Sequence, residues 1–135
     1  MRKAYTIALL LVLGISPGPG PQAQTETTLE TADLPHALDA GWEGHKPCEL
    51  LFTDDTVRVA RCIFPPGIGH EKHYHNPHFG YVLEGGRLSI TDSKGVHEVS
   101  TKAGGSWSTT TVTVHEAVNI GETTTSYLIV EPRID

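Results

Sequence analysis

From Lys46 onward the sequence is divided into short apolar runs, and this division limits the possible folds more than any other feature. The runs are rich in Val, Ile, Thr and Tyr and are bounded by Gly, Pro, Asn and Asp. No ten-residue window has a helical period. Such runs predict an all-β sandwich or barrel, and a closed or two-sheet roll hides its strand edges best. The runs cover residues 49–52, 57–64, 80–83, 88–91, 96–99, 107–114 and 124–130.

The first 45 residues do not share this pattern. Arg2 and Lys3 precede an apolar run over residues 7–13, far shorter than the roughly 20 apolar residues that span a bilayer. Its length is typical of the apolar core of a secretory signal, although an uncleaved anchor is an alternative. We therefore expect residues 1–24 to be a signal peptide, residues 25–45 a flexible N-terminal arm, and residues 46–135 the folded domain. The expected location is periplasmic or secreted, with no membrane association after cleavage of the signal.

The expected mature chain is acidic and poor in cysteine. The full chain has a formal net charge of −6, and loss of Arg2 and Lys3 makes the charge more negative. An acidic surface argues against nucleic acid and anionic lipid as partners. The two cysteines, Cys48 and Cys62, are too few for a miniprotein held by disulfides, so the chain must fold on an apolar core. Their spacing suits neighbouring antiparallel strands, and both a disulfide and two buried thiols remain open.

Half of the eight histidines in the chain lie within residues 70–78. His73 and His75 are two residues apart, so on a strand their imidazoles point to the same side and can form half of a metal site. The Asn-Pro pair that follows turns the chain, and His78 can return toward the same point. His115 lies in a distant strand-like run, as a ligand inside a barrel requires. The cluster therefore predicts a metal site built by two or three strands.

These residues give the chain a resemblance to the cupins. The first cupin motif has a glycine, a His-x-His pair, a glutamate and a second glycine, and it is matched by Gly67, His73, His75 and Gly85, with His78 in place of the glutamate. The second motif is matched by Gly104, His115 and Asn119, with Thr110 and Val112 in place of its proline and glycine. The resemblance covers residues 46–133. It implies one cupin-type β-barrel, a jelly-roll or double-stranded β-helix, which can pair with a second copy as a homodimer.

The ligand set that follows is His73, His75, His78 and His115, with His70 and Glu71 as alternatives. Because all four imidazoles are neutral, a divalent metal keeps its full charge and favours an anionic co-ligand such as a carboxylate, enolate or thiolate. Imidazole suits transition metals, so the expected metal is Fe, Cu, Zn, Ni or Mn. Four ligands would saturate a tetrahedral zinc, whereas a metal with five or six ligands would keep a position open.

Two functions are compatible with this site. One is a metal-dependent oxidoreductase, similar to cupin dioxygenases, that acts on a small anionic organic molecule. The alternative is a periplasmic protein that binds a metal or small ligand without turnover. A third reading is a cupin module without metal.

No residue is assigned as catalytic from the sequence. Tyr81, Arg61 and Trp107 are candidates to support the ligands or contact a substrate; Tyr81 and Trp107 are better explained as core residues, and Arg61 is equally explained by a solvated end or an ion pair. Asn119 is expected to hold a loop by hydrogen bonds to the backbone, and His97 is expected to be exposed.

Overall fold

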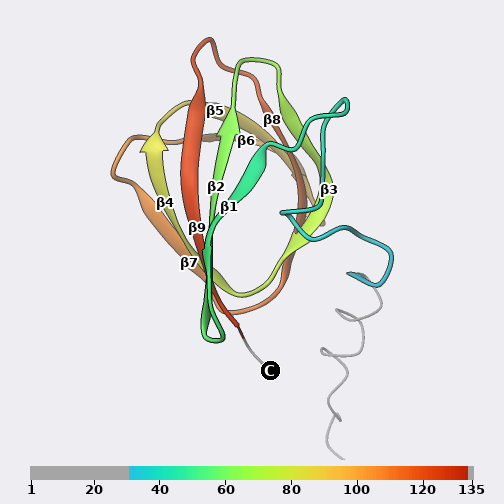
Figure 1. The fold of residues 1–135 in the computed structure, drawn as a ribbon. Coiled ribbons are helices and arrows are strands. Elements are labelled where there is room, and N and C mark those ends of the chain that lie inside the picture. Colours follow the sequence, from blue (N-terminus) through green and yellow to red (C-terminus); the bar gives the residue numbers. More distant parts are fainter. Residues whose placement is uncertain (1–30, 134–135) are drawn as a thin grey trace, which may run out of the picture.

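The computed structural model describes residues 31–133, and these residues form an all-β domain as the sequence predicts (Figure 1). The expected signal peptide and residues 25–30 lie outside the described residues. Within them, no helix is long and apolar enough to cross a membrane. The strands are β1 (Cys48–Thr53), β2 (Val57–Phe64), β3 (Gly69–His75), β4 (His78–Glu84), β5 (Arg87–Asp92), β6 (Gly95–Ser100), β7 (Ser106–Thr109), β8 (Thr113–Asn119) and β9 (Thr125–Pro132).

The strands form two antiparallel sheets, which corrects the prediction of a single closed barrel. The larger sheet has the order β1-β2-β9-β4-β7 and the smaller has the order β3-β8-β5-β6. β3 pairs with β8, whereas β4 pairs with β7 and β9, so the described strands have no ladder that joins the sheets. The chain crosses between the sheets several times, for example at residues 76–77, where a short turn leads from β3 to β4. Figure 1 shows the two sheets on opposite sides of a shared interior.

The apolar core lies on the inner face of the larger sheet. In β2, Ala60, Cys62 and Phe64 alternate with more exposed residues, as the two-residue period of a strand requires. Phe64 stacks on Tyr127 of β9, with 5.6 Å between the ring centroids. On its other side Phe64 meets His70 of β3 at 5.9 Å. The inward-facing histidines of β3 therefore lie in the interior directly beside the apolar core.

Asn119, at the end of β8, holds a loop to this core. Its side-chain Nδ2 donates hydrogen bonds to the carbonyl oxygens of Phe64 at 2.7 Å and of Thr123 at 2.8 Å. Its Oδ1 accepts a hydrogen bond from the backbone N–H of Gly121 at 2.8 Å. The role expected for Asn119 is confirmed.

The described part of the expected arm, residues 31–45, lies along the free edge of β3. The N–H of Ala37 donates to the carbonyl of Tyr74 at 3.0 Å, and the N–H of Tyr74 donates to the carbonyl of Pro35 at 3.1 Å. Further along, the N–H of Glu71 donates to the carbonyl of Gly41 at 2.9 Å. The segment thus satisfies backbone groups that an edge strand leaves open. In Figure 1 it is the blue-to-cyan stretch beside β3.

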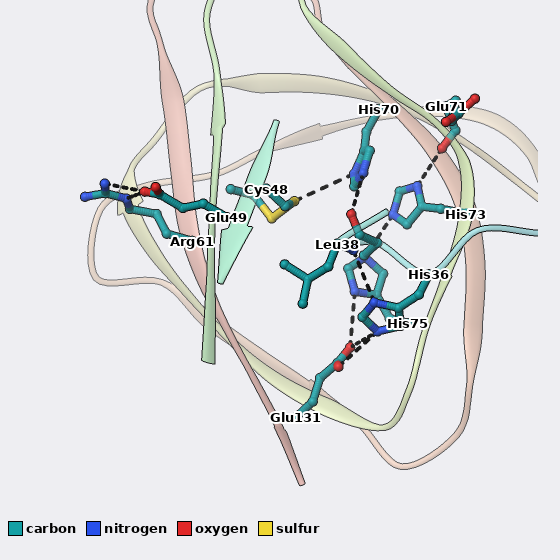
Figure 2. The surroundings of a disulfide bond; sticks show 12 residues. His36, Leu38, Cys48, Glu49, Arg61, His70, Glu71, His73, His75 and Glu131 are labelled. Atoms are coloured by element: carbon teal, nitrogen blue, oxygen red, sulfur yellow. Dashed lines mark hydrogen bonds and ion pairs between the residues drawn. A yellow bond between two sulfur atoms is a disulfide. The ribbon is translucent and has the colours of Figure 1, made fainter. Parts of the chain in front are cut away.

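Cys48 and Cys62 form a disulfide, one of the two states that the sequence leaves open. They lie directly opposite each other on β1 and β2, and both are buried. In the chain-entropy treatment, a loop of about 15 residues closed in this way stabilises a fold by about 3 kcal/mol. The bridge also fixes the edge strand β1 to the core beside His70 (Figure 2).

Candidate metal centre

Three imidazoles from the smaller sheet converge in the interior. His73 and His75 point inward from β3 and are buried, while Tyr74 between them is half-buried and Lys72 before them is exposed. His115 lies directly opposite His73 on β8. The ligand atoms of the three rings all lie within 4.8 Å of one another, so the group can hold a metal ion. Strand parity and antiparallel register together account for this convergence.

The hydrogen bonds around two of these rings leave a place for a cation. His73 Nδ1 donates to the carbonyl oxygen of Glu71 at 2.6 Å, so the lone pair of this neutral ring is on Nε2. Nε2 of His75 lies 2.9 Å from it. On the far side of its ring, His75 Nδ1 faces the carboxylate of Glu131 at 3.7 Å, which favours a proton on Nδ1. With that proton on His75 Nδ1, the lone pairs of His73 Nε2 and His75 Nε2 face each other and repel. A metal ion bound by both nitrogens removes this repulsion. The residues therefore fit a metal.

Burial keeps these imidazoles uncharged. Burial is the largest cause of the shift for His115, nearby histidines add to it, and its pKa falls to about 3. Burial likewise lowers the pKa of His73 and of His75. All three rings are therefore neutral at neutral pH, which is the form that ligates a metal.

His78, the fourth predicted ligand, lies beside this group but outside it. Its ring centroid is 4.9 Å from that of His75. Both of its nitrogens are occupied, because Nδ1 donates to the carbonyl of Asn76 at 2.8 Å and Nε2 accepts from Trp107 Nε1 at 3.3 Å. His78 can ligate through Nε2 only after Trp107 releases it, so its role as a ligand stays a prediction.

The indole of Trp107 can reach His78 because Gly80 lies under it. The two residues are register partners on β7 and β4, and a Cβ built on Gly80 would lie 2.2 Å from the ring. Gly80→Ala is therefore expected to displace the indole and destabilise the fold by about 1–3 kcal/mol, as overpacking does. Urea unfolding measures the loss, and fluorescence in a Trp42→Phe background reports the environment of Trp107.

The matched control for this prediction is Ser108→Ala, a change at an exposed position of the same strand. It should leave both the stability and the emission of Trp107 unchanged. Equal unfolding midpoints for Gly80→Ala and Ser108→Ala would show that the packing of the Trp107 indole does not require a glycine at position 80.

The two alternative ligands, His70 and Glu71, are engaged elsewhere. The ring of His70 is fully buried and stacks on His73, with 3.7 Å between centroids. Its Nε2 donates to the carbonyl of Ala37 at 2.9 Å. Glu71 is exposed and accepts a hydrogen bond from the N–H of Gly41 at 2.7 Å. His70 therefore supports the ring of a candidate ligand, and Glu71 holds the segment that lies along β3.

Of the three candidates for substrate contact, the structure brings one to the histidines. Trp107 contacts His78, as described above. Arg61 lies on the outer face of the larger sheet, where it pairs with Glu49. Tyr81 also faces outward and is exposed. Strand parity explains the difference, because the inner positions of β2 and β4 are taken by residues such as Cys62 and Val82.

The structure adds three residues that the sequence analysis does not find: Glu131, His36 and Arg58. Glu131 is buried on β9, and its Oε2 accepts from Arg58 Nη2 at 2.6 Å and lies 3.1 Å from His36 Nε2. Burial by itself would raise the pKa of the Glu131 carboxyl, but the neighbouring His36, His75 and Arg58 outweigh it and the pKa is lowered. The sequence contains one signal for the inward position of Glu131, namely strand alternation, because Glu131 lies two residues from the buried Ile129. No sequence signal connects His36 to this group.

A cavity of about 460 Å³ lies beside the centre. His78, His115 and Trp107 line it, together with residues at the ends of β5 and β8. Thr113 also lines it, and Thr113 Oγ1 is buried without a hydrogen-bond partner among the described residues. The volume suits a small organic molecule.

Comparisons with known proteins identify the fold. No protein-family model and no curated protein matches the sequence. A cupin domain from Bordetella pertussis superposes with a TM-score of 0.62 at 19% identity, covering 70% of this chain and 95% of that one. The polyketide cyclase RemF from Streptomyces resistomycificus gives a TM-score of 0.52 at 20% identity, covering 76% and 75%. An RmlC-like cupin family protein with a double-stranded β-helix fold, from Methanocaldococcus jannaschii, gives 0.50 at 20% identity, covering 63% and 77%.

Proposed function

The chain has the cupin fold, and we propose that it binds one divalent transition metal through His73, His75 and His115. The observation that carries the proposal is the convergence of three imidazoles, two buried and that of His115 half-buried, whose ligand atoms lie within 4.8 Å of one another. Fe, Cu, Zn, Ni and Mn all remain candidates, because imidazole nitrogen suits transition metals.

We further propose that the metal acts on a small anionic organic molecule in an oxidoreductase reaction of the dioxygenase type. Three protein ligands, in contrast to four, leave coordination positions open, which is typical of catalytic sites. The three neutral rings leave the charge of the metal uncompensated, and this favours an anionic co-ligand. The cavity that His115 lines provides room for such a molecule.

The residues around the centre have separate tasks in this proposal. A bound transition metal supplies Lewis acidity and, in the case of iron or copper, electron transfer. Trp107 covers the cavity side of His78 and holds its Nε2 away from the substrate. The apolar core beneath the histidines excludes water from that side.

The alternative function is binding of the metal or a small ligand without turnover. His78 decides between the two proposals, because a fourth imidazole would fill the tetrahedral shell of a zinc ion and leave no position for a substrate. The hydrogen bond from Trp107 to His78 favours the enzyme, since it keeps this fourth nitrogen occupied.

We also propose that the protein is exported to the periplasm or the medium. The apolar run near the N-terminus supports this location, as does the Cys48–Cys62 disulfide, because such bonds persist in oxidising compartments. The mass of the chain recovered from the exported fraction tests the proposal, with loss of about 24 residues expected from a cleaved signal.

The function is tested on protein purified from its own exported fraction without added metal. Elemental analysis should find one equivalent of a transition metal, and oxygen uptake is then measured with a panel of diketones, flavonols and thiols. The enzyme proposal expects uptake with at least one class, and no uptake with His115→Ala. Zinc held by four nitrogen ligands, with no reaction on the panel, would favour the binding protein instead.

A further inference from the structure

Glu131 is a buried carboxylate at the edge of the candidate metal centre. It lies on β9 at an inward position, in register with Arg58 of β2, and is 3% exposed. A buried ion is costly unless it is paired, so its retention inside the fold calls for specific partners. Figure 2 shows its carboxylate directed at the rings of His36 and His75.

The two oxygens of this carboxylate have different neighbours. Oε2 accepts hydrogen bonds from Arg58 Nη2 at 2.6 Å and Arg58 Nε at 3.0 Å. Oε1 has no contact with Arg58 and lies 3.7 Å from Nδ1 of His75. That nitrogen is buried and has no hydrogen-bond partner among the described residues. Oε2 therefore holds the ion pair with Arg58, while Oε1 faces His75 Nδ1 and also lies 3.2 Å from His36 Nε2.

His36, from the segment along β3, fixes the carboxylate from a third direction. The backbone N–H of Leu38 donates to His36 Nδ1 at 3.1 Å, which leaves the proton of this ring on Nε2. Nε2 lies 3.2 Å from Oε1 and 3.1 Å from Oε2 of Glu131 and can donate to the carboxylate, while Arg58 Nη2 lies 2.8 Å from the same nitrogen. The position of the carboxylate is thus set by β2 and by the N-terminal segment together.

We propose that Glu131 is a positioning residue for the metal centre. Its carboxylate accepts a hydrogen bond from the Nδ1–H of His75 and thereby directs the lone pair on His75 Nε2 toward the metal. The inference rests on the proposed metal-binding function. Ligating histidines generally donate their second ring N–H to a carboxylate or carbonyl, which fixes the tautomer and the ring orientation. His73 has such a partner in the carbonyl of Glu71, and Glu131 supplies the equivalent partner for His75. The sequence motif has no glutamate among the ligands, whereas the fold brings Glu131 close to Nδ1 of His75, the ring nitrogen that does not face the metal.

The test compares Zn²⁺ affinity, by calorimetry at pH 7.5, for the wild-type chain and Glu131→Gln. The expected loss is about 10- to 100-fold, the size typical of residues that support a ligand. The matched control is Glu49→Gln, which removes a carboxylate paired with arginine on the outer face of the same sheet and should leave the affinity unchanged. Equal affinities for Glu131→Gln and Glu49→Gln would overturn the inference.

Two further variants separate positioning from stability. Arg58→Gln removes the ion pair, but His36 still contacts the carboxylate beside His75, so this variant should lower stability and reduce Zn²⁺ affinity less than Glu131→Gln does. If Glu131→Gln does not fold, the double variant Arg58→Met/Glu131→Gln leaves no unpaired buried ion and should show the same loss of affinity. An equal loss in Arg58→Gln and the double variant would reduce Glu131 to a structural role.

A spectroscopic readout reports the tautomer itself. In Zn²⁺-loaded wild-type protein, two-bond ¹H–¹⁵N spectra should place the His75 proton on Nδ1, protected from exchange with solvent, and that protection should be lost in the double variant. An Nδ1 without a proton in the loaded wild type would overturn the inference while leaving the proposed metal centre intact. Failure of the wild-type chain to bind Zn²⁺ would overturn both.

Discussion

His115→Ala is expected to weaken the binding of Zn²⁺ or Co²⁺ by more than about 100-fold, because even residues that only support a ligand change metal affinity by about 10- to 100-fold. His115 is the ligand that the smaller sheet brings from β8 to the pair on β3. Without it the described group has two imidazoles, both from one strand. Calorimetry with the metal-free protein measures the change directly.

The same variant should lose the stabilisation that the metal gives to the folded chain. A ligand present at about 100 times its Kd stabilises the folded state by about 2.7 kcal/mol, so added Zn²⁺ should raise the melting temperature of the wild type but not of His115→Ala. His97→Ala is the control, because His97 is exposed on β6 as expected from the sequence. Equal Zn²⁺ responses in the two variants would remove His115 from the site.

The metal-free protein is expected to lose stability steeply as the pH falls below about 6.5. The pKa of His70 is about 4 and that of His115 about 3 in the folded chain, in both cases chiefly because of burial, against 6.5 for a free histidine. Between those values and 6.5 the unfolded chain binds more protons than the folded one. The stabilisation linked to these two neutral rings is therefore fully present above pH 6.5, and the free energy of unfolding decreases as the pH falls below that value.

At pH 5 this linkage amounts to about 2 kcal/mol for each of the two rings, or about 4 kcal/mol together. Domains of this size are stable by about 5–15 kcal/mol, so the loss is a large part of the total. The lowered pKa of the Glu131 carboxyl acts in a separate window. Its contribution is present above the unfolded value of about 4.5 and is lost at lower pH.

Urea midpoints at pH 7.5, 6 and 5 measure the acid effect in the presence of a chelator. His115→Ala should have the shallower dependence on pH, since one of the buried rings is absent. In the metal-loaded protein, stability should depend on pH more steeply still, because protons compete with the metal for the ligand nitrogens and the metal affinity should fall below about pH 6. A wild-type midpoint that is flat from pH 7.5 to 5 would contradict the buried, neutral state of the histidines.

Strand periodicity and the resemblance to the cupins together were sufficient to predict the three converging histidines. His73 and His75 share a face because they are two residues apart, and the cupin-like spacing of His115 predicts the third ring. Spacing alone could not show that Trp107 occupies Nε2 of His78, since that contact joins strands 29 residues apart. It also could not predict which face of β2 points inward, because apolar residues lie on both faces, and Arg61 was for this reason kept as a candidate.

The all-β class was predictable, and the sequence left open whether the strands form two sheets or a closed barrel, whereas the partners of Glu131 were not predictable. Closure of a barrel depends on pairing between particular strands, which a pattern of apolar runs does not specify. Glu131 and His36 are 95 residues apart and meet because the N-terminal segment lies along β3. That segment resembles an arm by composition, because it is rich in polar and small residues and has no sustained apolar period.

The central claim, a three-histidine metal centre with an open coordination position, is tested most directly by titration of the metal-free protein with Co²⁺, whose visible spectrum reports coordination number. We predict saturation at one equivalent, a spectrum of five- or six-coordinate cobalt that changes when a small carboxylate is added, and no saturable binding by His73→Ala/His115→Ala. Unaltered Co²⁺ binding by that double variant, or a four-coordinate spectrum that no carboxylate changes, would contradict the account.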